Sequence, residues 1–125
     1  MKKIINSKNA PAPIGPYSQA VLAGNTLFAS GQIAINSSSG ELMLSSIEEE
    51  TEQVMQNIKA VLDEASMTFE NIVKCSIFLS SMGSFLKVNE IYGKYFPANP
   101  PARETVEVSC LPKNVNVEIS FIAIK

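Results

Sequence analysis

The 125-residue chain contains no histidine, and this absence excludes several kinds of active site at once. Ser-His-Asp and Cys-His catalysis both require an imidazole, which is also the commonest metal ligand in proteins. The two cysteines, Cys75 and Cys110, cannot make a zinc site alone and form no Cys-x-x-Cys motif. We therefore expect no bound metal, and any catalysis must use arginine, carboxylates, hydroxyls, backbone groups and water. Cys75 lies in an apolar run, which predicts a buried and inert thiol.

The sequence also lacks a basic run and any long apolar segment. Ten lysine and arginine residues against twelve acidic ones give a formal net charge of −2, which does not favour binding to a negatively charged nucleic acid. No apolar stretch approaches the ~20 residues that a membrane-spanning helix needs. The N-terminus lacks the apolar core of a signal peptide. We expect a cytoplasmic protein that binds neither membranes nor nucleic acid.

What is present suits one domain over residues 1–125, since 46% of the residues are apolar and 18% are charged. The predicted elements, in chain order, are a short strand at 4–5, strands over 17–23 and 26–30, a helix over 46–65, a strand over 71–79, a helix beginning after Ser84, and strands over 102–109 and 115–124. Gly24-Asn25 is typical of a two-residue hairpin turn. The isolated Gly31 predicts a β-bulge or a close approach of backbone.

Capping residues mark the starts of both helices. Ser46 and Glu49 have the spacing of a capping box, in which each side chain bonds the other residue's backbone N–H. Ser84 is expected to cap the second helix. Two helices on a mostly β chain predict an α+β fold, a two-layer α/β sandwich in which a six-stranded mixed sheet carries both helices on one face. The other face keeps apolar side chains, which predicts contact with further copies of the chain.

The segment from Pro101 to Val108 sets an arginine at the start of a strand. Strand alternation puts Arg103, Thr105 and Glu107 on one face. It puts Ala102, Val106 and Val108 on the other face, which can pack on a core. A guanidinium is a permanently charged fork that matches a carboxylate with two parallel hydrogen bonds. Arg103 is therefore a candidate carboxylate-binding residue, although a surface arginine at a strand start is the simpler interpretation.

Short blocks along most of the chain match the pattern of a known family. They are Gly15-Pro16-Tyr17-Ser18-Gln19-Ala20, Ala29-Ser30-Gly31-Gln32-Ile33, Val88-Asn89-Glu90-Ile91-Tyr92, Pro101-Ala102-Arg103, Val106-Glu107-Val108, Leu111-Pro112-Lys113 and Val117-Glu118-Ile119. In order and spacing the chain resembles the RidA/YjgF family of reactive intermediate deaminases. The resemblance implies a chorismate-mutase-like homotrimer with a cleft at each subunit interface. It also implies hydrolysis of 2-iminopropanoate and 2-iminobutanoate to 2-oxo acids and ammonia, with no cofactor.

The resemblance assigns roles to individual residues. Arg103 would hold the carboxylate of the 2-imino acid, Glu118 would hold or activate a water, and Tyr17 would hydrogen-bond that water or the imine nitrogen. Each has a simpler alternative: Tyr17 would only pack beside the prolines, and Glu118 would be a surface residue.

Four further residues are assigned to substrate binding: Ser30, Gly31, Asn89 and Thr105. Thr105 stands where many family members have cysteine. Glu104 stands where small residues are frequent, and alternation predicts that it points away from Arg103.

Two other functions compete with the deaminase. A non-catalytic trimeric module would use the Arg103 cleft to bind a metabolite for regulation, and it would not need Glu118. An endoribonuclease would need a basic groove and an acid–base pair, which the net charge and the missing histidine disfavour.

Overall fold

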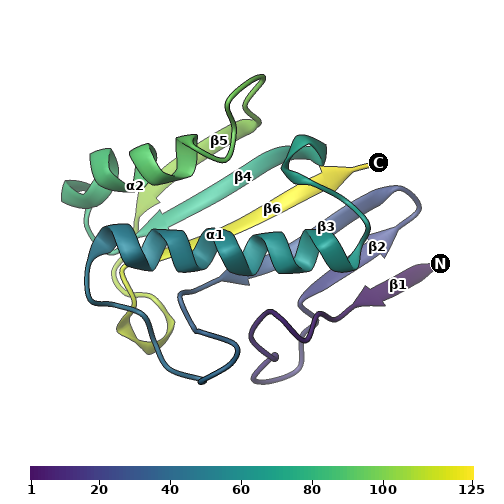
Figure 1. Cartoon of the computed structure of the whole chain (residues 1–125), viewed down its shortest axis with the longest axis horizontal. Helices are drawn as coiled ribbons and strands as arrows, with labels where there is room; N and C mark the ends of the chain where they lie inside the picture. Colours follow the sequence, from purple (N-terminus) through teal and green to yellow (C-terminus); the bar gives the residue numbers. More distant parts are fainter.

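A computed structural model describes all residues, 1–125, as a six-stranded mixed sheet with two α-helices on one of its faces (Figure 1). The strands are β1 (Lys2–Ile5), β2 (Ala20–Ala23), β3 (Thr26–Gln32), β4 (Ile72–Leu79), β5 (Ala102–Glu107) and β6 (Val117–Ile124). The helices are α1 (Ile47–Glu64) and α2 (Phe85–Gly93), with 3₁₀ turns at Phe69–Asn71, Met82–Ser84 and Pro112–Asn114. The sheet order is β1-β2-β3-β6-β4-β5. Only β4 and β5 are parallel, and they are joined through α2. The predicted fold class is confirmed.

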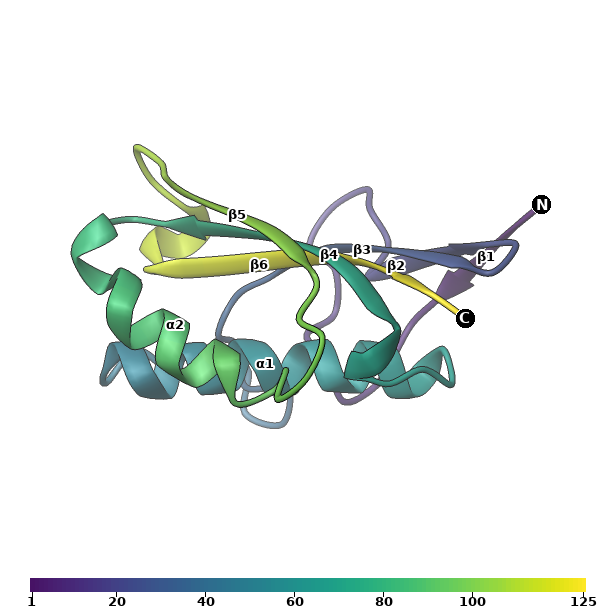
Figure 2. The same cartoon turned by 90° about the horizontal axis from the view of Figure 1, so that it is seen from above.

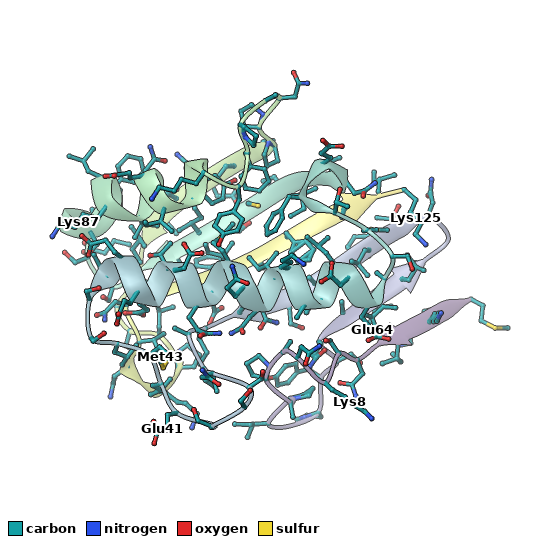
Figure 3. All side chains as sticks on the ribbon, in the orientation of Figure 1. Lys8, Glu41, Met43, Glu64, Lys87 and Lys125 are labelled. Carbon is teal, nitrogen blue, oxygen red and sulfur yellow. The ribbon has the colours of Figure 1, made fainter.

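The two helices form a single layer, which Figure 2 shows on one side of the sheet. The connection between β5 and β6 stands on the opposite, helix-free side. Charged residues such as Lys87 and Glu64 project from the outer surface of the helices (Figure 3). None of the helices is both long and apolar enough to span a membrane.

Helix α1 begins where the sequence predicts, but its cap is only half of a capping box. The Ser46 hydroxyl oxygen accepts a hydrogen bond from the Glu49 backbone N–H at 3.1 Å. The Glu49 carboxylate accepts from the Ser45 hydroxyl instead of returning to the Ser46 backbone. The three glutamates of the first turn, Glu48 to Glu50, lie at the positive end of the helix dipole.

The prediction that Ser84 caps α2 is wrong. Ser84 ends the 3₁₀ turn that runs directly into α2, its own backbone is already helical, and its side chain makes no capping hydrogen bond. The cap lies three residues earlier, where the Ser81 side chain accepts from the Gly83 backbone N–H at 3.1 Å. The turn leaves no extended residue at Ser84, which a capping side chain normally needs.

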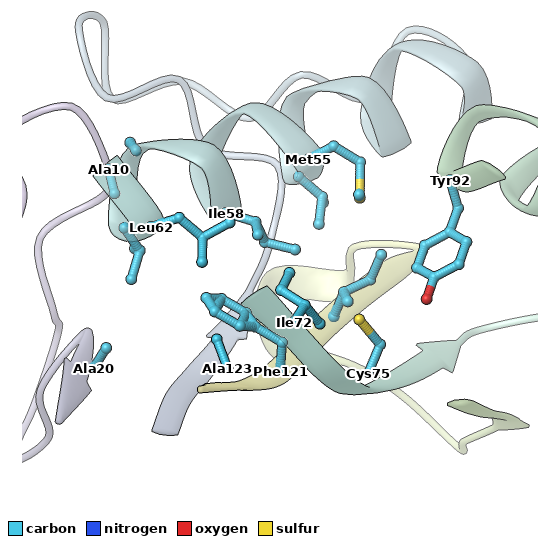
Figure 4. Close-up of a cluster of buried hydrophobic side chains, with 14 of the residues drawn as sticks. Ala10, Ala20, Met55, Ile58, Leu62, Ile72, Cys75, Tyr92, Phe121 and Ala123 are labelled. Carbon is cyan, nitrogen blue, oxygen red and sulfur yellow. The ribbon is translucent and has the colours of Figure 1, made fainter. Parts of the chain in front are cut away.

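The core lies between the helices and the sheet, as one cluster of 23 buried residues (Figure 4). Met55, Ile58 and Leu62 of α1 pack on Ile72 and Phe121 of the sheet. Burying each large apolar side chain contributes about 1.5–3 kcal/mol. This layer therefore holds α1 across the central strands, and it leaves the opposite sheet face uncovered.

The sequence signals in the β2–β3 region are confirmed. Ala23 pairs with Thr26, so Gly24 and Asn25 form the two-residue turn, with Gly24 at a φ of +62°. The pairing of β3 with β6 is regular up to Ala29 and resumes at Gln32, so the predicted bulge lies at Ser30 and Gly31. The bulge bends the strand and brings the Gly31 backbone towards β6.

The prediction that the Val106 face of β5 packs on a core is wrong. Arg103 and Thr105 face the helix side, where α2 covers them, whereas Glu104 and Val106 are exposed on the helix-free side. The reason is the position of β5 at the edge of the sheet, where only α2 covers it. Alternation was correct, but the assignment of the covered face was reversed.

Apolar side chains gather on the helix-free face. Register places one such row across four neighbouring strands: Ile4, Val21, Phe28 and Ile122. Phe28 and Ile4 are each 50% exposed. A contiguous apolar surface of this kind is typical of a protein–protein contact. We call this row the open-face patch.

Candidate active site

Four of the expected site residues line one cavity. Tyr17, Ser30, Gly31 and Glu118 lie together around a space of about 590 Å³. The remaining lining residues are Pro11, Ala12, Ile14, Gln19, Gln32, Ile33, Ile35, Pro112 and Lys113. The lining therefore combines several apolar side chains with one carboxyl, one phenol and one lysine. A mostly apolar cleft with a few polar groups is the usual form of a small-molecule site.

Glu118 is the carboxyl group of this cavity. Its neighbours Val117 and Ile119 are fully buried on the helix side of β6, so alternation turns Glu118 to the helix-free side. Burial raises the pKa of Glu118 above its usual value. A carboxyl with a raised pKa in a cleft is typical of a group that takes up and releases protons.

Gly31 lies against this carboxyl. A Cβ built on Gly31 would stand 2.7 Å from Cδ and 2.8 Å from Cγ of Glu118, which is closer than carbon atoms can approach. Only glycine fits here while Glu118 keeps its position. Both sequence interpretations of Gly31, the bulge and the close approach, therefore hold.

Tyr17 is carried by a loop that buried Gln19 anchors. The Gln19 side-chain amide donates to the carbonyls of Ser7, Ala10 and Pro11, and its oxygen accepts from the Ser7 N–H at 2.6 Å. The Tyr17 hydroxyl accepts from the Ile14 backbone N–H at 3.3 Å. Because that hydroxyl only accepts, its own proton remains available for another partner.

Ser30 ties β3 to the same loop. Its hydroxyl donates to the Ser18 carbonyl at 2.6 Å, and its backbone N–H donates to the Gln19 carbonyl at 2.9 Å. The hydroxyl proton is therefore committed within the protein, and only the lone pairs of the oxygen can meet a substrate.

Sequence reasoning missed the roles of Gln19 and Lys113 in the cavity, although both stand in the family blocks. Gln19 follows three prolines and a tyrosine, and nothing local indicates that it is buried. Lys113 has a φ of +56°, a left-handed backbone conformation that is uncommon for lysine and that the sequence does not indicate.

The other three expected residues form a second cluster under α2. The Arg103 Nη1 donates to the Asn89 side-chain oxygen at 2.6 Å, and the guanidinium carbon lies 5.2 Å from the centre of the Tyr92 ring. The Thr105 hydroxyl is buried nearby and has no hydrogen-bond partner. Neither Arg103 nor Asn89 lines the 590 Å³ cavity.

Within one chain the two clusters do not meet. Arg103 lies on the helix side of the edge strand β5, whereas Glu118 lies on the helix-free side of β6, and β4 stands between these strands. The structure thus brings Tyr17, Ser30, Gly31 and Glu118 together, and separately Asn89, Arg103 and Thr105.

Glu104 leaves Arg103 unpaired, as alternation predicts. Its carboxylate lies 2.9 Å from the Lys74 ammonium and accepts from the Ser76 hydroxyl, on the helix-free face. The Ser76 hydrogen bond, followed by the one from Lys74, lowers the pKa of Glu104. None of the three ion pairs of the chain includes Arg103.

The two thiols of the chain lie in different environments. Cys75 is buried as expected, and burial raises the pKa of its thiol despite the nearby Tyr92 hydroxyl and Arg103 charge. Cys110 is exposed. No three cysteine, aspartate or glutamate side chains lie close enough together to hold a metal ion.

Comparison with known proteins identifies the relatives of the chain. The family model described as endoribonuclease L-PSP matches residues 7–125. The human 2-iminobutanoate/2-iminopropanoate deaminase is 42% identical, with 100% of this chain and 91% of the human protein covered. A Rid-family structure from Yersinia pestis is 49% identical, with a TM-score of 0.97 and full coverage of both chains. The structure of E. coli TdcF with bound serine is 35% identical, with a TM-score of 0.94 and 98% of each chain covered.

Proposed function

Because the chain belongs to the RidA/YjgF family, described also as endoribonuclease L-PSP, we propose that it hydrolyses small 2-imino acids to 2-oxo acids and ammonia. The substrates would be 2-iminopropanoate and 2-iminobutanoate, which the name of the human relative contains. The observation that carries the proposal is the half-buried Glu118 carboxyl, with its raised pKa, in a cavity that also holds Tyr17. A purely carboxylate-binding module has no need of such a group.

The reaction needs a cation as well, and a second copy of the chain supplies it in our proposal. Arg103 and Glu118 lie on opposite faces of the same sheet, so one chain cannot place both on a small substrate. The open-face patch gives the chain an apolar surface for contact with other copies. In a homotrimer, Arg103 of one subunit would reach the Glu118 cavity of the next, which makes each interface a cleft.

Arg103 would bind and orient the substrate. A hydrogen bond to a charged group contributes about 1.5–3 kcal/mol, and the fixed orientation lowers the barrier further. The bound serine of the E. coli relative carries the same α-carboxylate as a 2-imino acid. The Arg103 cluster contains no carboxylate that would compete for the guanidinium.

Water addition needs one proton acceptor and one donor. Glu118, once ionised, takes a proton from a water whose oxygen forms a bond to C2 of the protonated imine, and the C=N electron pair moves to nitrogen. Glu118 then gives this proton to the amino group of the resulting carbinolamine. The C–N bond breaks with its electron pair leaving on ammonia, while the carbinolamine hydroxyl forms the C=O bond and passes its proton to Glu118, which releases it to solvent. The 2-oxo acid remains. Tyr17 can donate its hydroxyl proton to the water or to the nitrogen.

A coupled assay tests this function. Threonine dehydratase acting on threonine releases 2-iminobutanoate, and the release of 2-oxobutanoate and ammonia is followed with and without the protein. We expect the wild-type protein to accelerate release and Arg103→Ala to abolish the effect. Lys94→Ala is the matched control, since it removes an exposed cation from the end of α2 outside both clusters. No acceleration by the folded wild-type protein would overturn the deaminase assignment in favour of a metabolite-binding module.

A further inference from the structure

Helix α2 surrounds the guanidinium of Arg103 with three side chains. Phe85, Asn89 and Tyr92 are spaced i, i+4 and i+7 and therefore share one face of the helix. The guanidinium carbon lies 5.6 Å from the Phe85 ring centre and 5.2 Å from the Tyr92 ring centre, and Nη1 donates to the Asn89 side-chain oxygen at 2.6 Å. Both rings lie at distances typical of cation–π contacts.

Every contact that holds this guanidinium is electrically neutral. The nearest candidate acid along the chain, Glu104, is turned to the other face of the sheet and bound to Lys74. A guanidinium has five N–H donors, of which Asn89 occupies one. The orientation of Arg103 is thus fixed while its charge stays unpaired.

We propose that Phe85, Asn89 and Tyr92 are positioning residues, which we call the α2 clamp. The clamp fixes Arg103 in the orientation that receives a substrate carboxylate. It also requires a neutral residue at position 89. The inference rests on the proposed function only for the identity of the ligand, because the clamp exists in the ligand-free protein. A guanidinium that is already ordered loses less freedom when it binds. A carboxylate at position 89 would instead pair with Arg103 and occupy the donors that the substrate needs.

The Tyr92 hydroxyl separates the role of the ring from that of the polar group. Tyr92 is 4% exposed, and its hydroxyl faces the Cys75 thiol (Figure 4). The clamp therefore uses the ring alone. Tyr92→Phe should preserve the clamp, whereas Tyr92→Leu keeps an apolar side chain but removes the ring.

Nuclear magnetic resonance of the ligand-free protein tests the clamp directly. Arg103 is the single arginine of the sequence, so ¹⁵N-arginine labelling gives one side-chain signal without assignment. We expect slow rotation about the Nε–Cζ bond in the wild-type protein and in Tyr92→Phe, and fast rotation in Tyr92→Leu and Asn89→Ala. A wild-type guanidinium as mobile as that of Tyr92→Leu would overturn the clamp, whatever the activity.

Calorimetric binding of 2-oxobutanoate tests the need for a neutral residue. We expect Asn89→Asp to weaken binding about ten- to hundredfold, and by more than Asn89→Ala does. Asn25→Asp adds the same charge in the exposed β2–β3 turn and should leave binding unchanged. Unaltered binding in Asn89→Asp would refute the requirement. If the wild-type protein binds no 2-oxobutanoate, the proposed function fails, and the arginine signal still decides the clamp.

Discussion

Replacing Gly31 by alanine tests whether this glycine is present to make room for the Glu118 carboxyl. The added methyl group would stand 2.7 Å from Cδ of Glu118, and φ at Gly31 is not in the left-handed region, so the backbone itself accepts alanine. The whole effect of the substitution should therefore pass through the Glu118 side chain. We expect Gly31→Ala to push that side chain out of the cavity.

The magnitude follows from the overlap. Inserting a carbon into a filled space costs about 1–3 kcal/mol, and displacing a general acid–base group lowers kcat about 10²–10⁴-fold. In a Glu118→Ala background the overlap is gone, and the same Gly31→Ala change should cost nothing in activity. It should there stabilise the fold by about 0.4–1 kcal/mol, because alanine restricts the unfolded chain more than glycine does.

A double-mutant cycle measures this coupling. Imine hydrolysis and urea denaturation are followed for the wild-type protein, both single variants and the double variant. Gly93→Ala is the matched control, because a Cβ there meets nothing within 4 Å. If Gly31→Ala lowers activity equally with and without Glu118, the two residues act independently and the reasoning is refuted.

Two further predictions concern the charge of Glu118 and the open-face patch. Burial raises the pKa of Glu118, so its neutral form stabilises the fold fully below its usual value of 4.5, and this contribution is lost as the pH rises through the raised folded value. In denaturation experiments, Glu118→Gln should be as stable as the wild-type protein at pH 4 and more stable at pH 8, and its kcat should be lowered at least about 10²-fold. The exposed control Glu41→Gln should match the stability of the wild-type protein at both pH values. The same result for Glu118→Gln would contradict the raised pKa of Glu118. For the open-face patch, we expect sedimentation to show that Phe28→Lys dissociates the oligomer, because the new charge would lie in an apolar contact. The control Leu86→Lys changes a side chain of α2 that is 78% exposed and should leave the oligomer intact. An intact Phe28→Lys oligomer would place the contact elsewhere.

Local signals predicted the elements that local chemistry determines. The Gly24-Asn25 turn, the bulge at Gly31 and the start of α1 after Ser46 each depend on a few neighbouring residues, and each lies where the sequence indicates. The prediction that Ser84 caps α2 is wrong because a 3₁₀ turn precedes this helix. The spacing of apolar residues does not distinguish such a turn from the first turn of the α-helix.

The site depends on contacts between distant segments, which the sequence does not contain. Alternation correctly separated Arg103 from Glu104, but the face that α2 covers depends on β5 being an edge strand. The separation of Arg103 from Glu118 has the same cause, because it follows from strand order and not from either strand alone. The hydrogen bond between Asn89 and Arg103 joins a helix residue to a strand residue 14 positions later. The sequence block around Asn89 gives no indication of this partner.

The strand order also determines when the chain can fold during its synthesis. The last strand to be made, β6, lies in the middle of the sheet, between β3 and β4. Until the ribosome has released Val117–Ile124, the two halves of the sheet have no hydrogen-bonded partner in common, and β3 and β4 each keep one strand edge without a partner. Helix α1 therefore has only part of the sheet surface to pack on until β6 is in place. The complete sheet therefore forms only after β6 has been made, and a chain that stops before Val117 would expose the two strand edges that β6 normally covers, which favours aggregation.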